Sequence, residues 1–333
     1  MDRQVMDKPT IDLTGWMPIR FYWQENAPVI DWIYLDGTRF IEPFFEQTID
    51  GMMMQTPFNR LFRHQTSVDI LLDWQSRRPG VKPSGFIFHL SRCGSTLITQ
   101  MLATSDQHVV LSEPGPVDSV LHAHLRNPAV SNSERMTWAQ AMVSAMMPAQ
   151  DSGLKGFIKF DSWHTAHLPL LKTAFPDVPM IFLYREPIEV LISQLARRGS
   201  QTIPGYYTAT ALGLDLMTAM QLSAEEYCSR ILQKTCECVL ADNTADSMLL
   251  INYTQLPEFV FKKILPFFGV TLSDTEIEQM KRSTTRDAKD PHFSFSPDSA
   301  RKQSEATPEL RAIIDRLVTP LYAELESIRL KQQ

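Results

Sequence analysis

Residues 86–96 read "FIFHLSRCGST", an apolar run followed by a loop of small and basic residues and a typical helix start. In a strand–loop–helix unit, the backbone N–H groups of the loop and first helical turn point outward together and form an anion site. Gly94 lets an anion come close, Ser95 and Thr96 add hydroxyl donors, and Arg92 adds a fixed cation. The segment predicts a phosphate-type site, although a tight turn with a helix cap has the same composition.

The loop departs from that of metal-dependent nucleotide-binding proteins. A Walker loop has the form G-x-x-x-x-G-K-[ST], whose lysine bridges the terminal phosphates and whose hydroxyl binds Mg²⁺. Here Ser95 follows Gly94 directly, and the loop has no lysine. Among residues that follow the expected strands, only Asp161 is a candidate magnesium ligand. We expect an anion bound without metal, with a P-loop kinase that uses Mg·ATP as an alternative.

Short β-rich runs alternate with helical patterns after the first 80 residues or so of the chain. This alternation predicts an α/β, P-loop-like fold of three layers, with a central parallel sheet flanked by helices. Helices are expected from Pro187, over Leu212–Leu240 and over Pro308–Leu330. The expected strands are Gly85–Leu90, Val109–Leu111, Gly156–Phe160, Met180–Tyr184 and Met248–Asn252.

The beginning of the chain has a different pattern. Residues 1–80 contain aromatic-rich stretches, and Asp36-Gly37 is a plausible hairpin turn within them. Pro and Gly interrupt both kinds of periodicity in "RRPGVKPSG", residues 77–85, which is therefore the expected linker. The sequence predicts a small N-terminal accessory segment (1–80) before the main domain (81–333).

Composition narrows the class of protein. With 333 residues and 44% hydrophobic content, the chain can bury a sizeable core. Its formal net charge of −6 gives no general reason to bind nucleic acid or an anionic membrane. No run approaches the ~20 apolar residues of a membrane span, and the N-terminus lacks the apolar stretch of a secretion signal. We expect a cytoplasmic protein with four reduced thiols, because the cysteines lack zinc-ribbon spacing.

A second basic motif follows the expected strand 180–184. Arg185 lies where the strand ends, and Ser193 lies two turns into the next helix, on the side away from its apolar stripe. Both can face a ligand at the carboxyl edge of the sheet, where open α/β folds bind theirs. Each residue alone could be a strand cap or a solvated helix position, but the two occur together with the first loop.

Together, the two motifs resemble those of the sulfotransferases that use 3′-phosphoadenosine 5′-phosphosulfate (PAPS). In that family the first motif binds the 5′-phosphosulfate and the second binds the 3′-phosphate. The pattern is most similar to the tyrosylprotein sulfotransferases and their bacterial relatives, with "RST" at Arg282–Thr284 as one shared feature. The donor-site residues implied by the resemblance are Arg92, Cys93, Gly94, Ser95, Thr96, Arg185, Ser193, Arg197, Tyr253, Ser283 and Lys302.

The resemblance also implies catalytic roles. Glu113 matches the glutamate that takes the acceptor's proton, although it could instead cap the helix that begins near Pro114. Lys159 would stabilise the bridging oxygen, unless it only extends from a strand end into solvent. Arg92 would clamp the phosphosulfate with its planar fork of donors. A histidine base is the alternative to Glu113, with His89 expected to be packed inside the first strand.

The expected activity is transfer of a sulfuryl group from PAPS to a hydroxyl or amine, with release of 3′-phosphoadenosine 5′-phosphate (PAP) and no metal. The acceptor would be a small molecule or peptide, and the tyrosylprotein resemblance favours a phenol. Its pocket could be lined by Trp16, Phe21, Tyr22, Trp23 and residues 199–208, although large rings are more often core. A non-catalytic nucleotide-binding protein is the third hypothesis.

Overall fold

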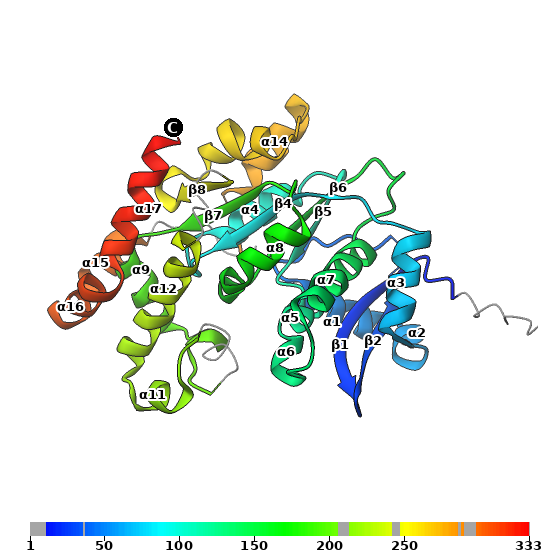
Figure 1. Cartoon of the computed structure of the whole chain (residues 1–333). Coiled ribbons are helices and arrows are strands. Elements are labelled where there is room, and N and C mark those ends of the chain that lie inside the picture. Colours follow the sequence, from blue (N-terminus) through cyan, green and yellow to red (C-terminus); the bar gives the residue numbers. More distant parts are fainter. Residues whose placement is uncertain are drawn as a thin grey trace, which may run out of the picture.

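The computed structural model describes residues 11–35, 37–205, 213–241, 247–285, 288–289 and 298–332. At its centre lies a five-stranded sheet in which all neighbouring strands are parallel (Figure 1). The strand order is β5-β6-β4-β7-β8, so the chain leaves β4 toward one side of the sheet and later returns to build the other. The strands are β4 (Pro83–His89), β5 (His108–Ser112), β6 (Lys155–Lys159), β7 (Met180–Tyr184) and β8 (Met248–Asn252).

All five predicted strands are confirmed, and β7 and β8 have the predicted bounds. Because β4 lies between β6 and β7, the carboxyl end of β4 is the point where the strand order reverses. Open α/β sheets bind their ligands in the crevice outside such a point. The loop that follows β4 is the segment that the sequence predicts to hold an anion.

Helices cover both faces of the sheet, which gives the predicted three layers. One face packs against α4 (Ser95–Leu102) and α14 (Asp274–Ser283). The other face packs against α5 (Gly115–Leu121), α7 (Asn132–Met146), α8 (Leu168–Ala174), α9 (Pro187–Ala196), α12 (Ala224–Leu240) and α17 (Thr319–Lys331).

Residues of β4 alternate between the two faces, as expected for a strand that is covered on both sides. Phe86 and Phe88 belong to the larger hydrophobic cluster, whereas Ile87 belongs to the cluster around α4. All three side chains are fully buried. This double burial fixes the direction in which the strand delivers the following loop.

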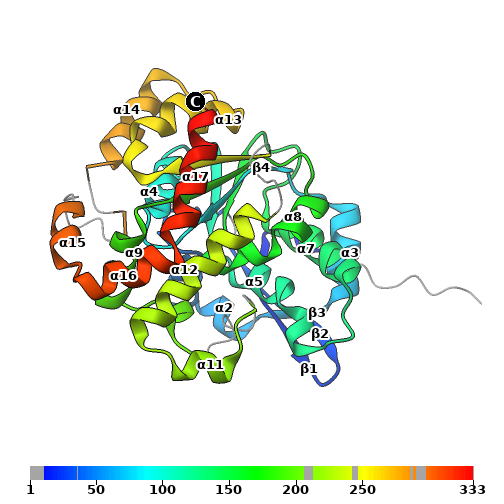
Figure 2. The same ribbon diagram turned by 60° about the vertical axis from the view of Figure 1, so that its left-hand side comes forward.

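Two predicted helices are each divided in the structure, so those two predictions were wrong. Residues 216–240 form α11 (Leu216–Gln221) and α12, because Ser223 has an extended backbone and its hydroxyl accepts the N–H of Glu226 (3.2 Å). Leu212 lies outside the described residues. Near the C-terminus, α16 (Pro308–Leu317) ends before α17, since Pro320 has no N–H to continue a helix. Figure 2 shows α12, α16 and α17 side by side.

The predicted hairpin turn was also wrong. The N-terminal hairpin pairs β1 (Trp16–Gln24) with β2 (Ala27–Tyr34), and it turns at Glu25-Asn26, where Glu25 has φ of 54°. Asp36 lies outside the described residues. The pair Glu25-Asn26 lacks the glycine that two-residue hairpin turns usually contain, whereas Asp36-Gly37 has it, which is why the sequence favoured the later pair.

The N-terminal part of the chain packs against the main sheet domain. Strands β1, β2 and β3 (His64–Ser67) form a separate antiparallel sheet, which contacts α5 and α7. Three helices accompany it: α1 (Phe45–Gln55), α2 (Pro57–Leu61) and α3 (Val68–Arg77). Phe21 of β1 lies 5.7 Å from Trp138 of α7, ring centroid to centroid, within one continuous hydrophobic cluster. The division at residue 80 stays a prediction.

In the described ranges, no helix is both long and apolar enough to cross a lipid bilayer.

Candidate active site

The loop after β4 has the backbone shape of an anion-binding nest. Ser91, Arg92 and Gly94 have positive φ angles of 71°, 51° and 91°, so successive N–H groups turn toward one side of the loop. Gly94 is the N-cap of α4. A Cβ atom at Gly94 would lie 2.9 Å from Cδ2 of Tyr253, so this position requires glycine both for its φ and for the close approach of the ring.

The side chains that follow in the loop have different surroundings. Cys93 points into the core, where its thiol donates to the carbonyl of Leu183 (3.2 Å) and burial raises its pKa to about 11. Only its backbone can therefore face a ligand. Ser95 and Thr96 are buried in the first turn of α4, with 5% and 4% exposure. The loop thus offers mainly N–H groups, two hydroxyls and the guanidinium of Arg92.

Glu113 and Lys159 form an ion pair at the carboxyl ends of β5 and β6. The two atoms Oε1 of Glu113 and Nζ of Lys159 lie 2.9 Å apart. Glu113 has φ of 57°, and its N–H donates to the carbonyl of Lys159 (2.7 Å), which fixes the strained residue. Lys159 is fully buried, and its Nζ also lies 3.5 Å from Oγ1 of Thr96. Lys159 therefore connects the anion-binding loop to the carboxylate.

The proton on His89 faces the same carboxylate. The N–H of Ser91 donates to Nδ1 of His89 (2.9 Å), so the neutral ring carries its proton on Nε2. Nε2 lies 3.4 Å from Oε1 of Glu113. Burial lowers the pKa of His89, which keeps the ring neutral. His89 is buried as predicted, and it also points its one proton toward Glu113.

Burial by itself would raise the pKa of Glu113. The charge of Lys159 and the contact with His89 outweigh burial and hold the pKa of Glu113 below its usual range. Asp161, two residues beyond β6, is in the opposite situation: burial and repulsion from Glu113 and Asp118 raise its pKa well above the usual value. Glu113 is thus the more acidic carboxylate of this crevice, and Asp161 is the weaker acid.

Arg185 lies at the end of β7 among acidic and aromatic partners. Its Nε donates to Glu189 (2.6 Å) and its Nη2 to Asp298 (2.6 Å) and Ser299 (3.0 Å). The guanidinium also stacks on the ring of Tyr253, with Cζ 4.1 Å from the centroid. Tyr253 therefore contacts both predicted motifs, since the same ring limits residue 94 to glycine. The structure brings Gly94, Tyr253 and Arg185 together.

Lys302 belongs to the same neighbourhood. It lies in α15 (Ser299–Glu305), is 4% exposed, and its Nζ is 2.6 Å from Oδ2 of Asp298. Burial lowers its pKa, and the charges of Arg185 and Arg92 act in the same direction, whereas Asp298 opposes them. Arg92, Arg185 and Lys302 therefore form one cationic group at the carboxyl edge of the sheet.

The other predicted donor-site residues are less closely connected. Ser193 is buried one turn beyond Glu189 on the same face of α9, and Arg197 is exposed just after that helix. Ser283 ends α14, where its hydroxyl donates to the carbonyl of Met280 (2.7 Å). Roles for Ser193, Arg197 and Ser283 in donor binding stay predictions.

Sequence reasoning missed Lys289. Its Nζ lies 5.9 Å from the ring centroid of Phe44, the same ring that Lys159 approaches at 4.8 Å. Burial, Arg92 and Lys159 lower the pKa of Lys289 to about 8. The residue lies in a segment rich in Ser, Asp and Pro, which has no periodicity that could place it beside the loop.

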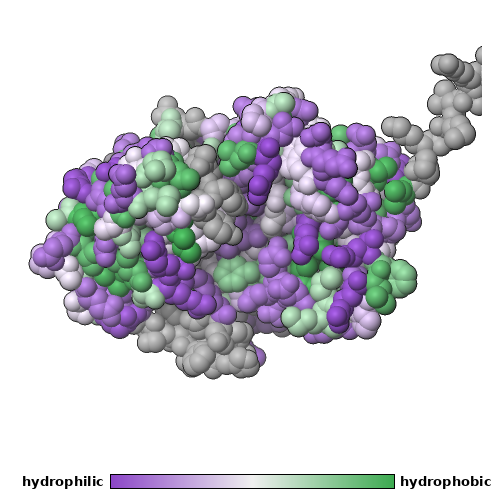
Figure 3. Space-filling view, turned by 90° about the horizontal axis from the view of Figure 1, so that it is seen from below, coloured by the Kyte–Doolittle hydropathy of each residue, from purple (hydrophilic) through white to green (hydrophobic). Residues whose placement is uncertain are grey.

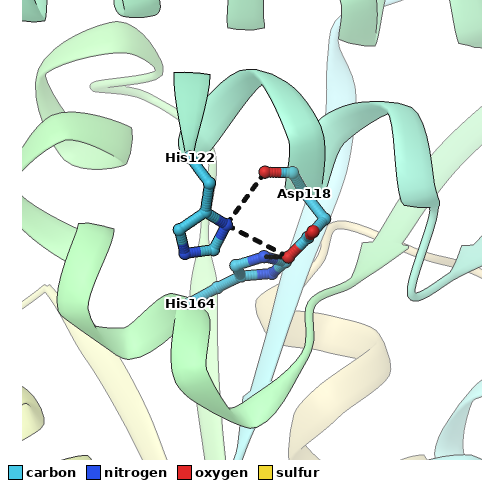
Figure 4. Close-up of side chains that lie close together, drawn as sticks. All are labelled: Asp118, His122 and His164. Atoms are coloured by element: carbon cyan, nitrogen blue, oxygen red, sulfur yellow. Dashed lines mark hydrogen bonds and ion pairs between the residues drawn. The ribbon is translucent and has the colours of Figure 1, made fainter. Parts of the chain in front are cut away.

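A second polar cluster lies on α5 and the turn after β6 (Figure 4). Oδ1 of Asp118 accepts from Nε1 of Trp163 (2.8 Å) and Nε2 of His164 (2.7 Å), and Nδ1 of His122 lies 3.2 Å away. The N–H of Asp161 donates to Nδ1 of His164 (3.1 Å), so the proton of His164 lies on Nε2. Nδ1 of His122 likewise faces the carbonyl of Asp118 (3.0 Å) and carries its proton.

Asp118, His122 and His164 are close enough together to hold a metal ion. However, a metal binds the lone pair of a histidine nitrogen, whose second nitrogen normally donates to an oxygen. Here the second nitrogen of His164 accepts a backbone N–H, so the nitrogen that faces Asp118 is protonated. The cluster is therefore a hydrogen-bonded network that fastens α5 to the turn after β6.

A cavity of about 700 Å³ lies between β1 and the helices that follow Glu113. A neighbouring cavity of about 690 Å³ shares part of this lining and includes Gly115, two residues after Glu113. Trp16 instead lines a separate cavity, and residues 206–208 lie outside the described chain. Figure 3 shows the underside of the molecule, where polar residues surround a central hollow. The first cavity is lined by Phe21, Tyr22, Trp23, Asp118, Ser119, His122, Leu125 and Arg126.

Residues 83–274 match the model of the sulfotransferase family, and this range includes β4 and its loop, Glu113, Lys159 and Arg185. The chain belongs to the sulfotransferase family. This match confirms the family predicted from the two motifs, and with it sulfuryl transfer as the general activity. Among curated proteins, no sequence matches this sulfotransferase.

Three solved sulfotransferase structures are similar to this chain at low sequence identity. Sulfotransferase STF9 from Mycobacterium avium has 13% identity, a TM-score of 0.45, and coverage of 80% of each chain. STF1 from Mycobacterium tuberculosis H37Rv has 15% identity and a TM-score of 0.40, with 75% of this chain and 82% of that one covered. Mouse SULT7A1 complexed with PAP has 15% identity and a TM-score of 0.41, with 80% of this chain and 94% of that one covered.

Proposed function

We propose that this sulfotransferase moves a sulfuryl group from PAPS to a hydroxyl or amine acceptor and releases PAP. One observation carries the proposal. The buried ammonium of Lys159 contacts both the hydroxyl of Thr96, in the anion-binding loop, and the carboxylate of Glu113. An anionic donor in the loop and an acceptor beside Glu113 would therefore meet at one cation.

The donor would span the two motifs. Its 5′-phosphosulfate would bind the N–H groups of residues 92–96, the hydroxyls of Ser95 and Thr96, and Arg92. Its 3′-phosphate would bind Arg185 and Lys302, which already hold a carboxylate oxygen at 2.6 Å each. Tyr253 lies between these two places because its ring contacts Gly94 and Arg185.

Transfer would proceed by in-line displacement at sulfur. Glu113 would take the proton of the acceptor while the acceptor oxygen or nitrogen forms the new bond to sulfur. The bond between sulfur and the bridging oxygen breaks, and its electron pair leaves with the phosphate of PAP. Lys159 and Arg92 would stabilise the charge that develops on the bridging oxygen and on the group in transfer.

Donor binding would also strengthen the base. In the unliganded protein the ammonium of Lys159 holds the pKa of Glu113 low, against the effect of burial. A sulfate beside Lys159 would compete for that ammonium, and the effect of burial would then raise the pKa of Glu113. A base whose pKa lies closer to the working pH accepts a proton more readily.

The acceptor would enter through the cavity beside β1. Its aromatic wall of Phe21, Tyr22 and Trp23 suits a ring, which supports a phenolic hydroxyl as the acceptor. Transfer would need no metal, since the loop after β4 lacks the Walker lysine and a sulfuryl group carries less negative charge than a γ-phosphoryl group. We also place the protein in the cytoplasm, a proposal supported by its four free cysteines.

Calorimetric titration with PAP and, separately, with Mg·ATP tests the donor site. We expect micromolar binding of PAP that does not depend on magnesium and that weakens by about ten- to a hundredfold in Arg185→Ala, since hydrogen bonds to charged groups contribute ~1.5–3 kcal/mol. Adenosine 5′-phosphosulfate, which lacks the 3′-phosphate, should bind this variant and the wild type alike. Preference for Mg·ATP would instead support the kinase hypothesis, and PAP binding without any turnover of PAPS would support the non-catalytic one.

A further inference from the structure

One carboxylate lies between the two cations to which we assign the 3′-phosphate. Oδ1 of Asp298 is 2.6 Å from Nη2 of Arg185, and Oδ2 of the same side chain is 2.6 Å from Nζ of Lys302. A phosphate bound to both cations would present two of its oxygens in the same way. Asp298 therefore occupies the place of an anion in the unliganded site.

The positive charge of this site is too small to neutralise the 3′-phosphate as well as both carboxylates. Arg185 and Lys302 supply two positive charges, and Glu189 and Asp298 already balance them. The third cation of the group, Arg92, is assigned to the 5′-phosphosulfate. A phosphate carries up to two further negative charges, so its entry with both carboxylates in place would leave the buried site strongly negative. Uncompensated charge of this kind is costly away from water. One carboxylate has to leave when the nucleotide binds.

The surroundings of the two carboxylates differ. The Glu189 side chain is 9% exposed and accepts hydrogen bonds from Arg185, Ser299 and Gln303, at 2.6, 3.0 and 3.0 Å. The Asp298 side chain is 34% exposed, and its carboxylate contacts the two cations. The backbone carbonyl of Asp298 accepts the N–H of Lys302 (3.0 Å), but its side chain caps no N–H of α15, so a rotation of the side chain would not uncap the helix. Asp298 is the carboxylate that can move away.

We propose that Asp298 is a displaceable counter-ion of the donor site, which the 3′-phosphate replaces between Arg185 and Lys302. This inference rests on the proposed function. Asp298 keeps the two cations in position and neutralised while the site is empty. Its return competes with bound PAP, so it lowers the affinity for the product and speeds product release.

Titration of the Asp298→Asn variant tests the inference. Asparagine has nearly the same shape but cannot neutralise the cations, so we expect PAP to bind about tenfold more tightly and to dissociate correspondingly more slowly. Binding of adenosine 5′-phosphosulfate should stay unchanged, because that ligand has no 3′-phosphate. Glu305→Gln is the matched control: Glu305 lies at the other end of α15, pairs with Arg301 at 2.6 Å, and should leave both affinities unchanged.

Other results would overturn the inference. If Asp298→Asn binds PAP as the wild type does or more weakly, Asp298 only positions the two cations. A tighter binding of both nucleotides would show a general charge effect rather than exchange at the 3′-phosphate. If Asn impairs folding, judged by the melting temperature, Asp298→Ser repeats the test. Loss of PAP binding in Arg185→Ala together with an unchanged Asp298→Asn rejects this inference alone, whereas no binding of PAP to the wild type rejects the proposed donor site as well.

Discussion

Glu113 and Asp118 lie five residues apart in the sequence, and both carboxylates repel that of Asp161. Asp118 is surrounded by ring donors: the indole of Trp163 and nitrogens of His164 and His122. Glu113 is paired with a buried ammonium and has a strained backbone, with φ of 57°. The pKa of each lies below its usual range, although burial acts to raise it.

The two carboxylates differ in whether a bound ligand can compete for the groups that stabilise their charge. The donors to Asp118 belong to ring side chains that are held in the protein, and the proton of His164 is fixed on the facing nitrogen by the N–H of Asp161. The ammonium that holds Glu113 can be shared with any anion bound beside Thr96. A lowered pKa alone therefore does not separate a catalytic carboxylate from a structural one, whereas the identity of the partner does.

Glu113→Gln tests the catalytic role of Glu113, and it should have the largest effect on the rate. Glutamine cannot take a proton, so we expect the rate of sulfuryl transfer to fall by about 10²–10⁴-fold. PAP should bind nearly as in the wild type, because Glu113 is assigned to the acceptor side. Radiolabelled PAPS with a phenol screen measures the first quantity, and calorimetry measures the second. Retained turnover would instead support the alternative of a histidine base.

Lys159→Met removes the cation and keeps an unbranched side chain. We expect a loss of about 10²–10³-fold in kcat, the usual cost of one preorganised donor. The acid side of the pH profile should change as well. In the free wild-type enzyme, which the pH profile of kcat/KM reports, Lys159 depresses the pKa of Glu113, so this activity should hold until the pH falls below the usual range of a glutamate. Without Lys159, burial raises the pKa of Glu113, and activity should fall at a higher pH. An unshifted profile would show that Glu113 does not titrate as the base.

Much of the fold could be predicted because its signals are local. The β-rich runs of β7 and β8 are bounded by turn residues, and Pro187 marks the start of α9. The loop at residues 91–96 was recognisable because glycine and hydroxyl residues follow a buried strand. The breaks at Ser223 and Val318 were missed because a helical pattern continues across them, and only the cap and Pro320 show the interruption.

The site could be predicted only in part, for a similar reason. Arg185 and Glu113 end strands, so the sheet places them at one edge. Asp298, Ser299 and Lys289 reach the same edge from a segment without periodicity, and only the folded chain shows them beside Arg185 and Lys159. The roles of Cys93 and His89 also depend on side-chain direction: one thiol points into the core, and one ring points toward Glu113.

Asp118→Asn tests the structural role of Asp118. We expect PAP to bind as in the wild type but stability to fall by about 1–3 kcal/mol, because the amide donates where three donors already point. The folded protein holds the pKa of Asp118 below its unfolded value of about 3.9, so its contribution is present above that pH and is lost as the pH falls further. Urea unfolding from pH 7 to pH 3 should therefore show a constant deficit in the variant that shrinks at the acid end. A large loss of kcat with unchanged stability would mean that the Asp118 network, like Glu113, takes part in the chemistry.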